Sequence, residues 1–376
     1  MSNLFQRPVW AEIDLSAIKN NVREIKKVIG DKKIIGVIKA NAYGHGAVET
    51  GKALKEEGVN FFAVAILEEA LELRRAGFED EILILGWTPS EDYQKCLENN
   101  LILCLYDYEE GTRLNEKARE LNTTARVHIK IDTGMSRIGF LPNEKSFQEI
   151  LKIMDLGNIS VEGIFSHLSK ADEKNKSYAE HQIKVFSDFT GKIENQSGKK
   201  ITWKHISNSA AILDLPKAHF NMVRAGIILY GLKPSDEVCF EDKNFIPAMT
   251  LKARLSRVEK IPKNSLVSYG GLYEAPEDTQ IGTIPIGYAD GYTRLLTGKG
   301  QVLVKGEKRN ILGKICMDQC MVDLHGIENI HKGDEVILMG GGNIGESADD
   351  IAKKLGTINY EVVCMISERV PRKYLD

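Results

Sequence analysis

The chain has 376 residues, of which 43% are hydrophobic and 27% are charged, and its 50 basic and 53 acidic side chains give a formal net charge of −3. This is ordinary globular composition, with a length sufficient for two domains and without the basic excess of a nucleic-acid-binding protein. Apolar runs long enough to span a membrane and an amino-terminal secretion signal are both missing from the sequence, so we expect a cytoplasmic protein that binds neither membrane nor nucleic acid.

Strand-like and helix-like patterns alternate through the first two-thirds of the chain. The first run, 8–15, could pair with strands much later in the sequence. Helical patterns are clearest at 47–58, 67–77 and 178–193, where apolar residues recur every three or four positions. Eight further short strands rich in β-branched residues are predicted at 34–39, 61–64, 82–85, 101–105, 125–131, 160–165, 201–206 and 222–225.

Eight apolar strands separated by crossovers match a (β/α)8 barrel, although a doubly wound open sheet alternates in the same way. Beyond residue 235 apolar and polar residues alternate, Gly pairs mark turns, and one short helix is expected near 347–355. This pattern is typical of antiparallel sheets. We therefore expect an α/β protein with a TIM barrel over residues 1–235, followed by a mainly antiparallel β domain over residues 236–376.

The six cysteines are scattered and show no paired zinc-ligand spacing. Cys316 and Cys320 are four residues apart, but no second pair accompanies them. We expect reduced, mostly buried thiols and no metal site.

Polar side chains follow the predicted barrel strands at the end where the active sites of such barrels lie. Each has an ordinary explanation when taken alone, such as a lysine that reaches solvent, a buried neutral histidine or a helix cap. Their joint placement at one rim is what indicates a site. The candidates are Lys39, Tyr43, Gly86, Trp87, Lys130, Asp132, Arg137, His167, Ser207, Asn208, Ser209, Arg224, Gly226 and Ile227.

The loops after the seventh and eighth strands have the composition of a phosphate site. Small hydroxyl and amide side chains gather there, and barrels often bind phosphate at this position. The glycine patterns of dinucleotide and P-loop sites do not occur in the expected strand–turn–helix setting. A lysine such as Lys39, across a cavity from a phosphate, suits a Schiff base. Together these features predict pyridoxal 5'-phosphate as the cofactor.

Eight motifs run in order along the chain. They are VIKANAYGHG (37–46), DTGMSRIG (132–139), HISNSA (205–210), RAGIILYG (224–231), SYGG (268–271), GYADG (287–291), CMDQ (316–319) and NYE (359–361). Through these motifs the chain resembles the alanine racemase family, within the fold-type III group of pyridoxal-phosphate enzymes, over essentially its whole length. Ser136 departs from the family pattern, which commonly has Gly there.

The resemblance implies interconversion of L- and D-alanine, which supplies D-alanine for peptidoglycan. It also implies a homodimer in which each active site is completed by the β domain of the other subunit. Lys39 would bind the cofactor covalently and act as one base, and Tyr269 of the partner subunit would act as the other.

The same resemblance assigns the remaining site residues. Arg137 and the backbone of Met317 would orient the substrate carboxylate. Lys130 matches a position that is often carbamylated, and Tyr288 would line the access path. The cofactor would be held by Tyr43, His167, Asn208, Ser209, Arg224, Gly226, Ile227 and Tyr360, with Arg224 facing the pyridine nitrogen.

Elementary chemistry agrees with these roles. Racemization removes a proton from one face of the α-carbon and returns one to the other, so two bases on opposite faces are the simple arrangement. A phenol is a weak acid, so Tyr269 would need nearby donors or positive charge, which His167 and Arg224 could supply. Since a guanidinium keeps its proton, Arg224 should leave the pyridine nitrogen unprotonated and disfavour transamination.

Three alternatives remain at this stage. A fold-type III decarboxylase would need an acidic side chain where Arg224 stands. A non-catalytic pyridoxal-phosphate carrier would lack the β domain and Tyr269. A racemase for another amino acid, such as serine or lysine, is less well excluded. His45 has no expected role beyond shaping its turn.

Overall fold

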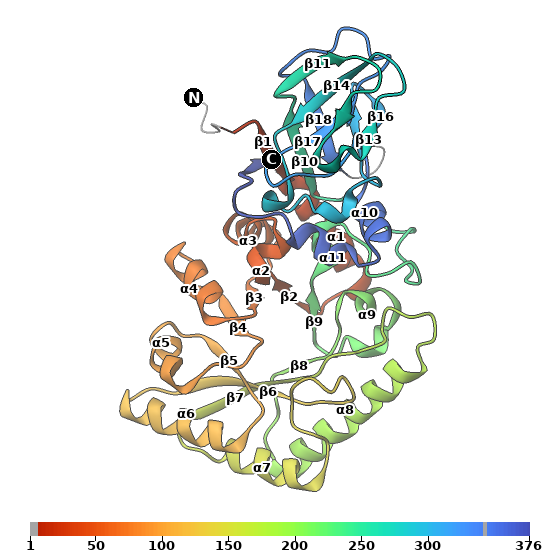
Figure 1. Cartoon of the computed structure of the whole chain (residues 1–376). Coiled ribbons are helices and arrows are strands. Elements are labelled where there is room, and N and C mark those ends of the chain that lie inside the picture. Colours follow the sequence, from red (N-terminus) through yellow and green to blue (C-terminus); the bar gives the residue numbers. More distant parts are fainter. Residues whose placement is uncertain (1–6, 341–343) are drawn as a thin grey trace.

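An eight-stranded parallel sheet forms a nearly closed barrel in the computed structural model, which describes residues 7–340 and 344–376 (Figure 1). The strand order is β8-β7-β6-β5-β4-β3-β2-β9, and Arg224 N donates to Ser207 O across the remaining seam at 3.1 Å. The predicted TIM barrel is therefore confirmed. Its strands are β2 (Lys33–Val37), β3 (Phe61–Val64), β4 (Glu81–Ile84), β5 (Ile102–Leu105), β6 (Ala125–Lys130), β7 (Ile159–Phe165), β8 (Trp203–His205) and β9 (Met222–Ala225).

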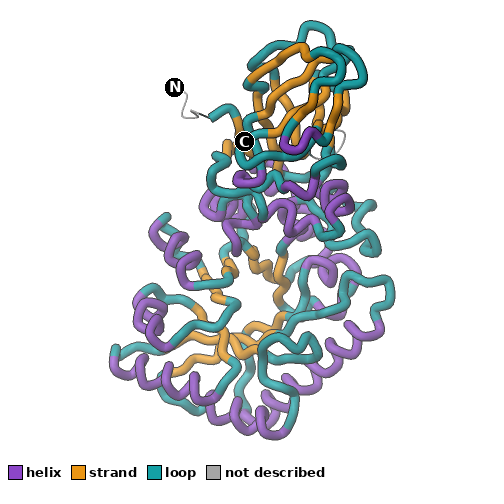
Figure 2. Tube along the Cα trace, viewed as in Figure 1, coloured by secondary structure: helices purple, strands orange, loops and turns teal. Residues whose placement is uncertain are grey.

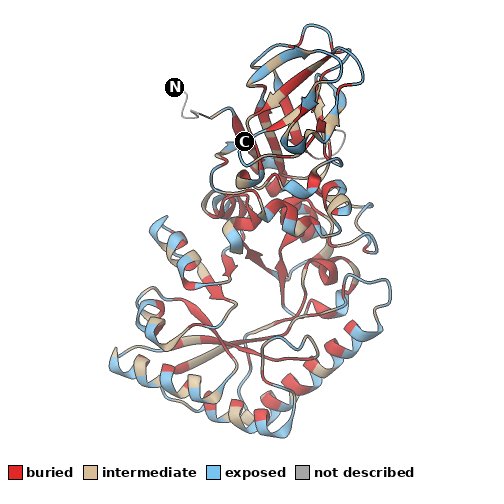
Figure 3. Ribbon diagram, viewed as in Figure 1, coloured by how far each residue is buried: buried red, intermediate tan, exposed pale blue. Residues whose placement is uncertain are grey.

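Helices surround the barrel, with buried faces toward the strands and exposed faces toward solvent (Figures 2 and 3). In α1, Ile18, Val22 and Ile25 are fully buried along one stripe, and the Asp14 carboxylate caps the helix by accepting from Ala17 N. The predicted helices at 47–58, 67–77 and 178–193 are observed within a few residues. The helices of this part are α1 (Leu15–Ile29), α3 (Ala47–Glu56), α4 (Leu67–Arg75), α5 (Tyr93–Glu98), α6 (Tyr108–Glu120), α7 (Glu144–Met154), α8 (Ser177–Ser197) and α9 (Ser209–Asp214).

A nine-stranded, mostly antiparallel sheet forms the β domain, in the order β11-β14-β17-β16-β15-β18-β10-β1-β19. β1 (Val9–Asp14) pairs antiparallel with β10 (Met249–Arg254) and parallel with β19 (Arg372–Leu375), so the first strand joins the β domain as expected. The other strands are β11 (Arg257–Ile261), β14 (Thr279–Ile284), β15 (Gln301–Val304), β16 (Glu307–Leu312), β17 (Cys320–Asp323) and β18 (Glu335–Met339).

Three smaller elements complete this domain. β12 (Leu266–Val267) and β13 (Tyr273–Glu274) form a separate hairpin, α10 (Ala348–Leu355) confirms the predicted short helix, and α11 (Asn359–Cys364) follows it. The boundary after residue 235 stays a prediction. Two predictions fall partly outside the described residues. One is the strand that ends in the glycines at 340 and 341, and the other is that the amino terminus carries no secretion signal.

The first barrel strand ends earlier than predicted. β2 stops at Val37, and Lys39 instead opens the short turn α2 (Lys39–Tyr43). Four consecutive residues of this turn, 40–43, have φ between 51° and 53°, so the turn is left-handed. Each L-residue in this conformation costs about 1–2 kcal/mol, and none of the four is Gly, so no sequence pattern predicts the left-handed turn.

None of the helices in the described part of the chain combines the length and apolar character needed to cross a membrane.

Candidate active site

A cavity of about 560 Å³ opens at the carboxyl ends of the barrel strands, on the rim where the site was predicted. Its size suits a small cofactor and substrate. Its described lining includes four cationic side chains and no carboxylate, which favours an anionic ligand. The predicted site residues on its wall are Lys39, Tyr43, Lys130, Arg137, His167, Asn208, Ser209, Arg224, Gly226, Ile227 and Tyr360, together with Gly86 and Trp87.

Lys39 enters this cavity from the start of the left-handed turn. The Glu69 carboxylate accepts from the next amide, Ala40 N, at 2.6 Å. Burial, followed by the positive charge of Arg137, lowers the pKa of Lys39. A larger fraction of this amine is therefore unprotonated at neutral pH, and the unprotonated amine is the form that attacks a carbonyl or accepts a proton.

Tyr43, Ser209 and Gly226 form a close polar cradle in the wall of the same cavity, near the adjacent strands β2 and β9. Gly226 N donates to Ser209 Oγ at 3.1 Å. A Cβ atom at Gly226 would lie 2.9 Å from Tyr43 Oη and 3.6 Å from Ser209 Oγ, so only Gly leaves this space open. Burial raises the pKa of Tyr43 and of Tyr360, so both phenols keep their protons and can donate hydrogen bonds.

Arg224 is buried beneath the cavity and donates to three backbone carbonyls. These are Ser166 O at 2.7 Å, His205 O at 3.1 Å and Ile206 O at 3.2 Å. Burial lowers the pKa of Arg224 to about 9, which still leaves the guanidinium charged at neutral pH. The side chain is therefore a cation that is fixed through its two terminal nitrogens.

A chain of histidines extends from Arg224. Because the guanidinium can only donate, it donates to Nδ1 of His205 at 2.9 Å and to Nδ1 of His167 at 3.2 Å. His205 then carries its proton on Nε2 and donates to Nδ1 of His128 at 2.9 Å. Burial lowers the pKa of His128 to about 3 and holds those of His205 and His167 well below their usual value. All three rings are neutral, and His167 presents an Nε2–H donor.

Lys130 lies buried at the end of β6. Burial and the neighbouring charge of Arg224 lower its pKa to about 7. Its Nζ donates to Ile131 O at 3.2 Å and lies 5.1 Å from the centroid of the Phe165 ring. A lysine in this setting is largely neutral at mildly alkaline pH.

Asp132 shapes the loop that carries Arg137. Its Oδ1 accepts from Gly134 N, Met135 N and Ser136 N at 2.9, 2.9 and 3.0 Å. Ser136 has φ +57°, a conformation that Gly adopts more easily, which gives a physical reason for the Gly of the family pattern. The carboxylate therefore orders the loop backbone.

Tyr269, Tyr288 and Met317 are absent from the described lining of this cavity. They lie on the β domain and are 68%, 42% and 53% exposed. Tyr288 N and Ala289 N donate to Cys316 O and Met317 O at 3.1 and 3.0 Å. Ser268 Oγ, next to Tyr269, donates to Lys314 O at 2.6 Å. The three residues therefore lie on neighbouring loops of the β domain, and none of them lines the barrel cavity of its own chain.

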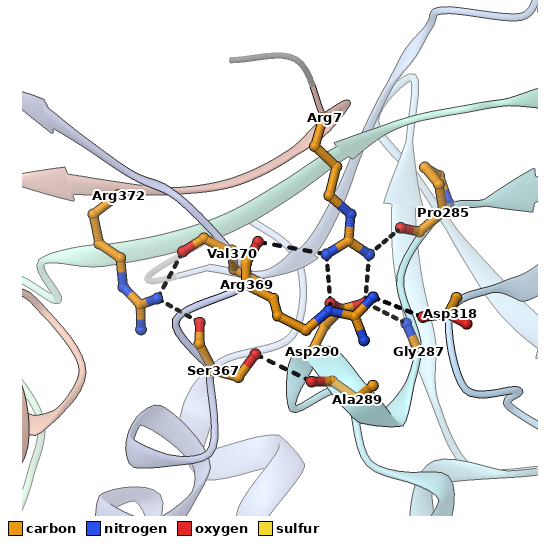
Figure 4. A network of polar contacts seen from close by, with 10 residues as sticks. All are labelled: Arg7, Pro285, Gly287, Ala289, Asp290, Asp318, Ser367, Arg369, Val370 and Arg372. Carbon is orange, nitrogen blue, oxygen red and sulfur yellow. Dashed lines mark hydrogen bonds and ion pairs between the residues drawn. The ribbon is translucent and has the colours of Figure 1, made fainter. Parts of the chain in front are cut away.

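A polar network surrounds Asp290, in the loop that carries Tyr288 (Figure 4). The buried Asp290 carboxylate accepts from Arg7 and from Gly287 N, and Arg369 pairs with both Asp290 and Asp318. The loops that carry Tyr288 and Met317 are thereby held to the carboxyl-terminal segment.

Some residues of the site were missed from the sequence. His128 and His205 stand inside predicted apolar strands, and a polar residue in such a strand was the available signal. Tyr106 and Phe165 end or follow strands and read as packing residues. Cys364 reaches the cavity from α11, and no local pattern indicates that approach.

Comparison with known proteins assigns the family. The family model for the alanine racemase N-terminal domain matches residues 13–234, and the model for its C-terminal domain matches residues 248–374. The chain belongs to the alanine racemase family. This confirms the resemblance of its motifs.

Relatives in the alanine racemase family cover almost the entire chain. The alanine racemase of Clostridium perfringens strain SM101 is 48% identical over 369 residues, which are 98% of this chain and 95% of the relative. That of Methanococcus maripaludis is 48% identical over 374 residues, covering 99% and 100%. The structure of alanine racemase from Clostridium difficile 630 superposes with a TM-score of 0.95 at 46% identity, covering 99% of this chain and 96% of the other. Enzymes of this family are pyridoxal-phosphate-dependent isomerases, and the chain is an amino-acid racemase of this kind.

Proposed function

We propose that this protein interconverts L- and D-alanine in the barrel cavity, with pyridoxal 5'-phosphate as cofactor and Lys39 as its covalent anchor. The observation that carries the proposal is the cavity itself. It combines a lysine of lowered pKa, a cradle of hydroxyl and amide groups, and an excess of fixed positive charge.

The residues of the cavity suit a phosphate-bearing aldehyde. The open space at Gly226 and the donors around it would receive the phosphate, through Tyr43, Ser209 and the amides of Gly226 and Ile227. Tyr360 and Asn208 stand beside them on the cavity wall. When bound, pyridoxal phosphate supplies the electron withdrawal that acidifies the α-carbon of an amino acid.

Two bases would then act on opposite faces of that carbon. Lys39 moves the proton on one face, aided by its lowered pKa. Tyr269 of the partner subunit moves it on the other, and the Nε2–H of His167 is a donor that would stabilise a phenolate. The Arg137 guanidinium and the backbone of Met317 would orient the substrate carboxylate.

Arg224 would favour racemization over transamination. Its hydrogen bonds to three carbonyls and two histidines hold it as a charged donor. A charged guanidinium does not release a proton to the pyridine nitrogen, so Arg224 would leave that nitrogen unprotonated and would favour return of the proton to the α-carbon of the substrate. A decarboxylase, which would need an acid here, is disfavoured.

Lys130 is suited to carbamylation. Its pKa of about 7 makes the neutral amine available, and a neutral amine reacts with carbon dioxide. The resulting carbamate would be a fixed anion among cations, close to Arg224 and able to brace Arg137.

A homodimer explains the surface formed by Tyr269, Tyr288 and Met317. Exposed aromatic and apolar side chains gathered in one place mark an interaction surface, and Leu266 and Leu272 add to it. In a dimer, Tyr288 would line the access path of the other subunit's site. We further propose a cytoplasmic location and a role in supplying D-alanine for peptidoglycan.

The size of the substrate agrees with ligands of related enzymes. One solved structure is alanine racemase from Bacillus anthracis with bound L-Ala-P, at 37% identity and a TM-score of 0.91, covering 99% of this chain and 96% of that one. Another is the Clostridium difficile enzyme in complex with cycloserine. Both ligands are small, which favours alanine over bulkier amino acids here.

A coupled assay of both alanine enantiomers, beside serine and lysine, tests this proposal. We expect conversion of alanine in both directions and much slower conversion of the others. Turnover of serine or lysine without alanine would contradict the substrate. A Lys39→Ala variant should lose the absorption band of the covalently bound cofactor, and a full band in that variant would contradict the anchor.

A further inference from the structure

The left-handed turn at residues 40–43 connects two residues of the proposed site. Lys39, the proposed cofactor anchor, directly precedes the turn, and Tyr43, a proposed phosphate ligand, is its last residue. Four consecutive non-glycine residues with φ near +52° are unfavourable on their own and persist only where surrounding structure holds them. The contacts around the turn show what holds it.

His45 holds the turn from its buried side. Its Nδ1 lies 3.0 Å from both Ala42 O and Tyr43 O. Burial lowers the pKa of His45 to about 4, so the ring is neutral. Since both partners are carbonyls, Nδ1 carries the proton and donates. Nε2 is buried and has no hydrogen-bond partner among residues 7–340 and 344–376, so Nδ1 makes the polar contacts of this ring.

Tyr230 ties His45 to the barrel. The two rings stack with centroids 4.4 Å apart, and Tyr230 Oη donates to Val37 O, at the end of β2, at 3.0 Å. The histidine is therefore fixed against the strand that leads into the turn.

Arg372 holds the other end of the turn. Its Nε donates to Gly44 O at 2.9 Å, and a terminal nitrogen donates to Ile366 O at 2.6 Å. The other terminal nitrogen donates to Ser367 O at 2.6 Å and to Val370 O at 2.7 Å (Figure 4). Because the Arg372 guanidinium donates to four backbone carbonyls, its position is closely restrained. Ser367 also binds the loop of Tyr288, through Ala289 O and Asp290 O.

We propose that His45 and Arg372 are positioning residues that hold the left-handed turn and thereby set the Lys39 amine and the Tyr43 hydroxyl in the cavity. These contacts by themselves support the restraint on the backbone. The effect on the Lys39 amine and the Tyr43 hydroxyl in catalysis rests on the proposed function. Arg372 also connects the turn to the loop of Tyr288, because it donates to Gly44 O and to Ser367 O, and Ser367 donates to that loop.

Two substitutions of His45 separate its hydrogen bonds from its packing. His45→Phe keeps a ring on Tyr230 and loses the Nδ1 donor. His45→Asn keeps a side-chain N–H near the Nδ1 position and loses the stacking. Amide hydrogen exchange of residues 40–46 in the cofactor-free protein reports on the turn directly.

We expect at least about tenfold faster exchange and at least about tenfold weaker cofactor binding for His45→Phe, with His45→Asn closer to the unsubstituted protein. In His45→Phe, kcat should also fall by a larger factor than KM changes, because the Lys39 amine is misplaced. If both variants exchange and bind as the unsubstituted protein does, the positioning role is wrong. The same holds if Phe and Asn perturb the turn equally.

Arg372→Met tests the second residue, with Arg74→Met as the matched control. Arg74 also donates to four carbonyls, of Phe78, Asp80, Asn99 and Asn100, but away from the turn. Only Arg372→Met should speed exchange at 40–46 and weaken cofactor binding, and Arg372→Lys should restore part of both. Equal effects of the two Met variants would contradict the proposal. If the unsubstituted protein racemizes no alanine, the proposed function fails, while the exchange comparison still decides the restraint.

Discussion

A methyl group at Gly226 should disturb one hydroxyl of the proposed phosphate cradle and little else. In Gly226→Ala the new Cβ would lie 2.9 Å from Tyr43 Oη and 3.6 Å from Ser209 Oγ. The first distance is too short, and the Tyr43 hydroxyl, at the far end of its side chain, is the group that moves. The fold should therefore tolerate the change.

The expected loss is one hydrogen bond to a charged phosphate, which is typically about 1.5–3 kcal/mol. This corresponds to about 10- to 150-fold weaker binding of pyridoxal phosphate. Titration of the cofactor-free protein, followed by absorbance, measures it, and chemical denaturation without cofactor should show nearly unchanged stability.

A double-mutant cycle with Tyr43→Phe checks the mechanism. Tyr43→Phe removes the same hydroxyl, so Gly226→Ala should cost much less affinity in that background. Unchanged affinity in Gly226→Ala would refute the cradle. Fully additive losses would refute the route through Tyr43.

Three further predictions concern the turn, the pyridine partner and the buried lysine. Gly44→Ala and Gly77→Ala both place Ala at positive φ, 82° and 86°, which should lower the free energy of unfolding by about 1–2 kcal/mol. Only Gly44→Ala also brings the new Cβ to 2.4 Å from Val363 O, which should cost about 1–3 kcal/mol more. Chemical denaturation measures both losses, and equal losses would contradict the prediction. Arg224→Glu should raise transamination, measured as pyruvate formed per racemization event, and an unchanged ratio would refute the argument. Lys130, with a pKa of about 7 when folded and near 10.4 when unfolded, binds fewer protons in the folded state between these values, so its contribution makes the free energy of unfolding rise from pH 7 to pH 10. In bicarbonate-free buffer Lys130→Met should lose that rise, and identical pH slopes would contradict the burial of a free amine.

Much of the barrel and its rim was predictable from the sequence. The strands are short and almost wholly apolar, so their runs stand out between charged helices, as in β3, β5 and β9. Once the barrel is assumed, its topology brings the carboxyl ends of all strands to one rim. Residues as distant in sequence as Lys39, Arg137 and Arg224 could therefore be assigned to one site from the sequence alone.

The remaining features depend on tertiary contacts. The left-handed turn has no glycine at 40–43 and is held by His45 and Arg372, the second of which lies more than 300 residues away along the chain. The hydrogen-bonded chain from Arg224 to His128 joins three strands, and only spatial neighbours reveal it. The role of His45 was not predictable because its hydrogen-bond partners are backbone carbonyls, which leave no trace in a sequence motif.

Lys39 of one subunit and Tyr269 of the partner subunit should act at the same α-carbon. Mixed dimers of Lys39→Ala and Tyr269→Phe chains, carrying different affinity tags and purified for both, test this pairing. Such a dimer contains one site with both substitutions and one with neither. We predict about half the alanine racemase activity of the unsubstituted dimer, although each variant alone is nearly inactive. Mixed dimers as inactive as their parents would contradict the shared site.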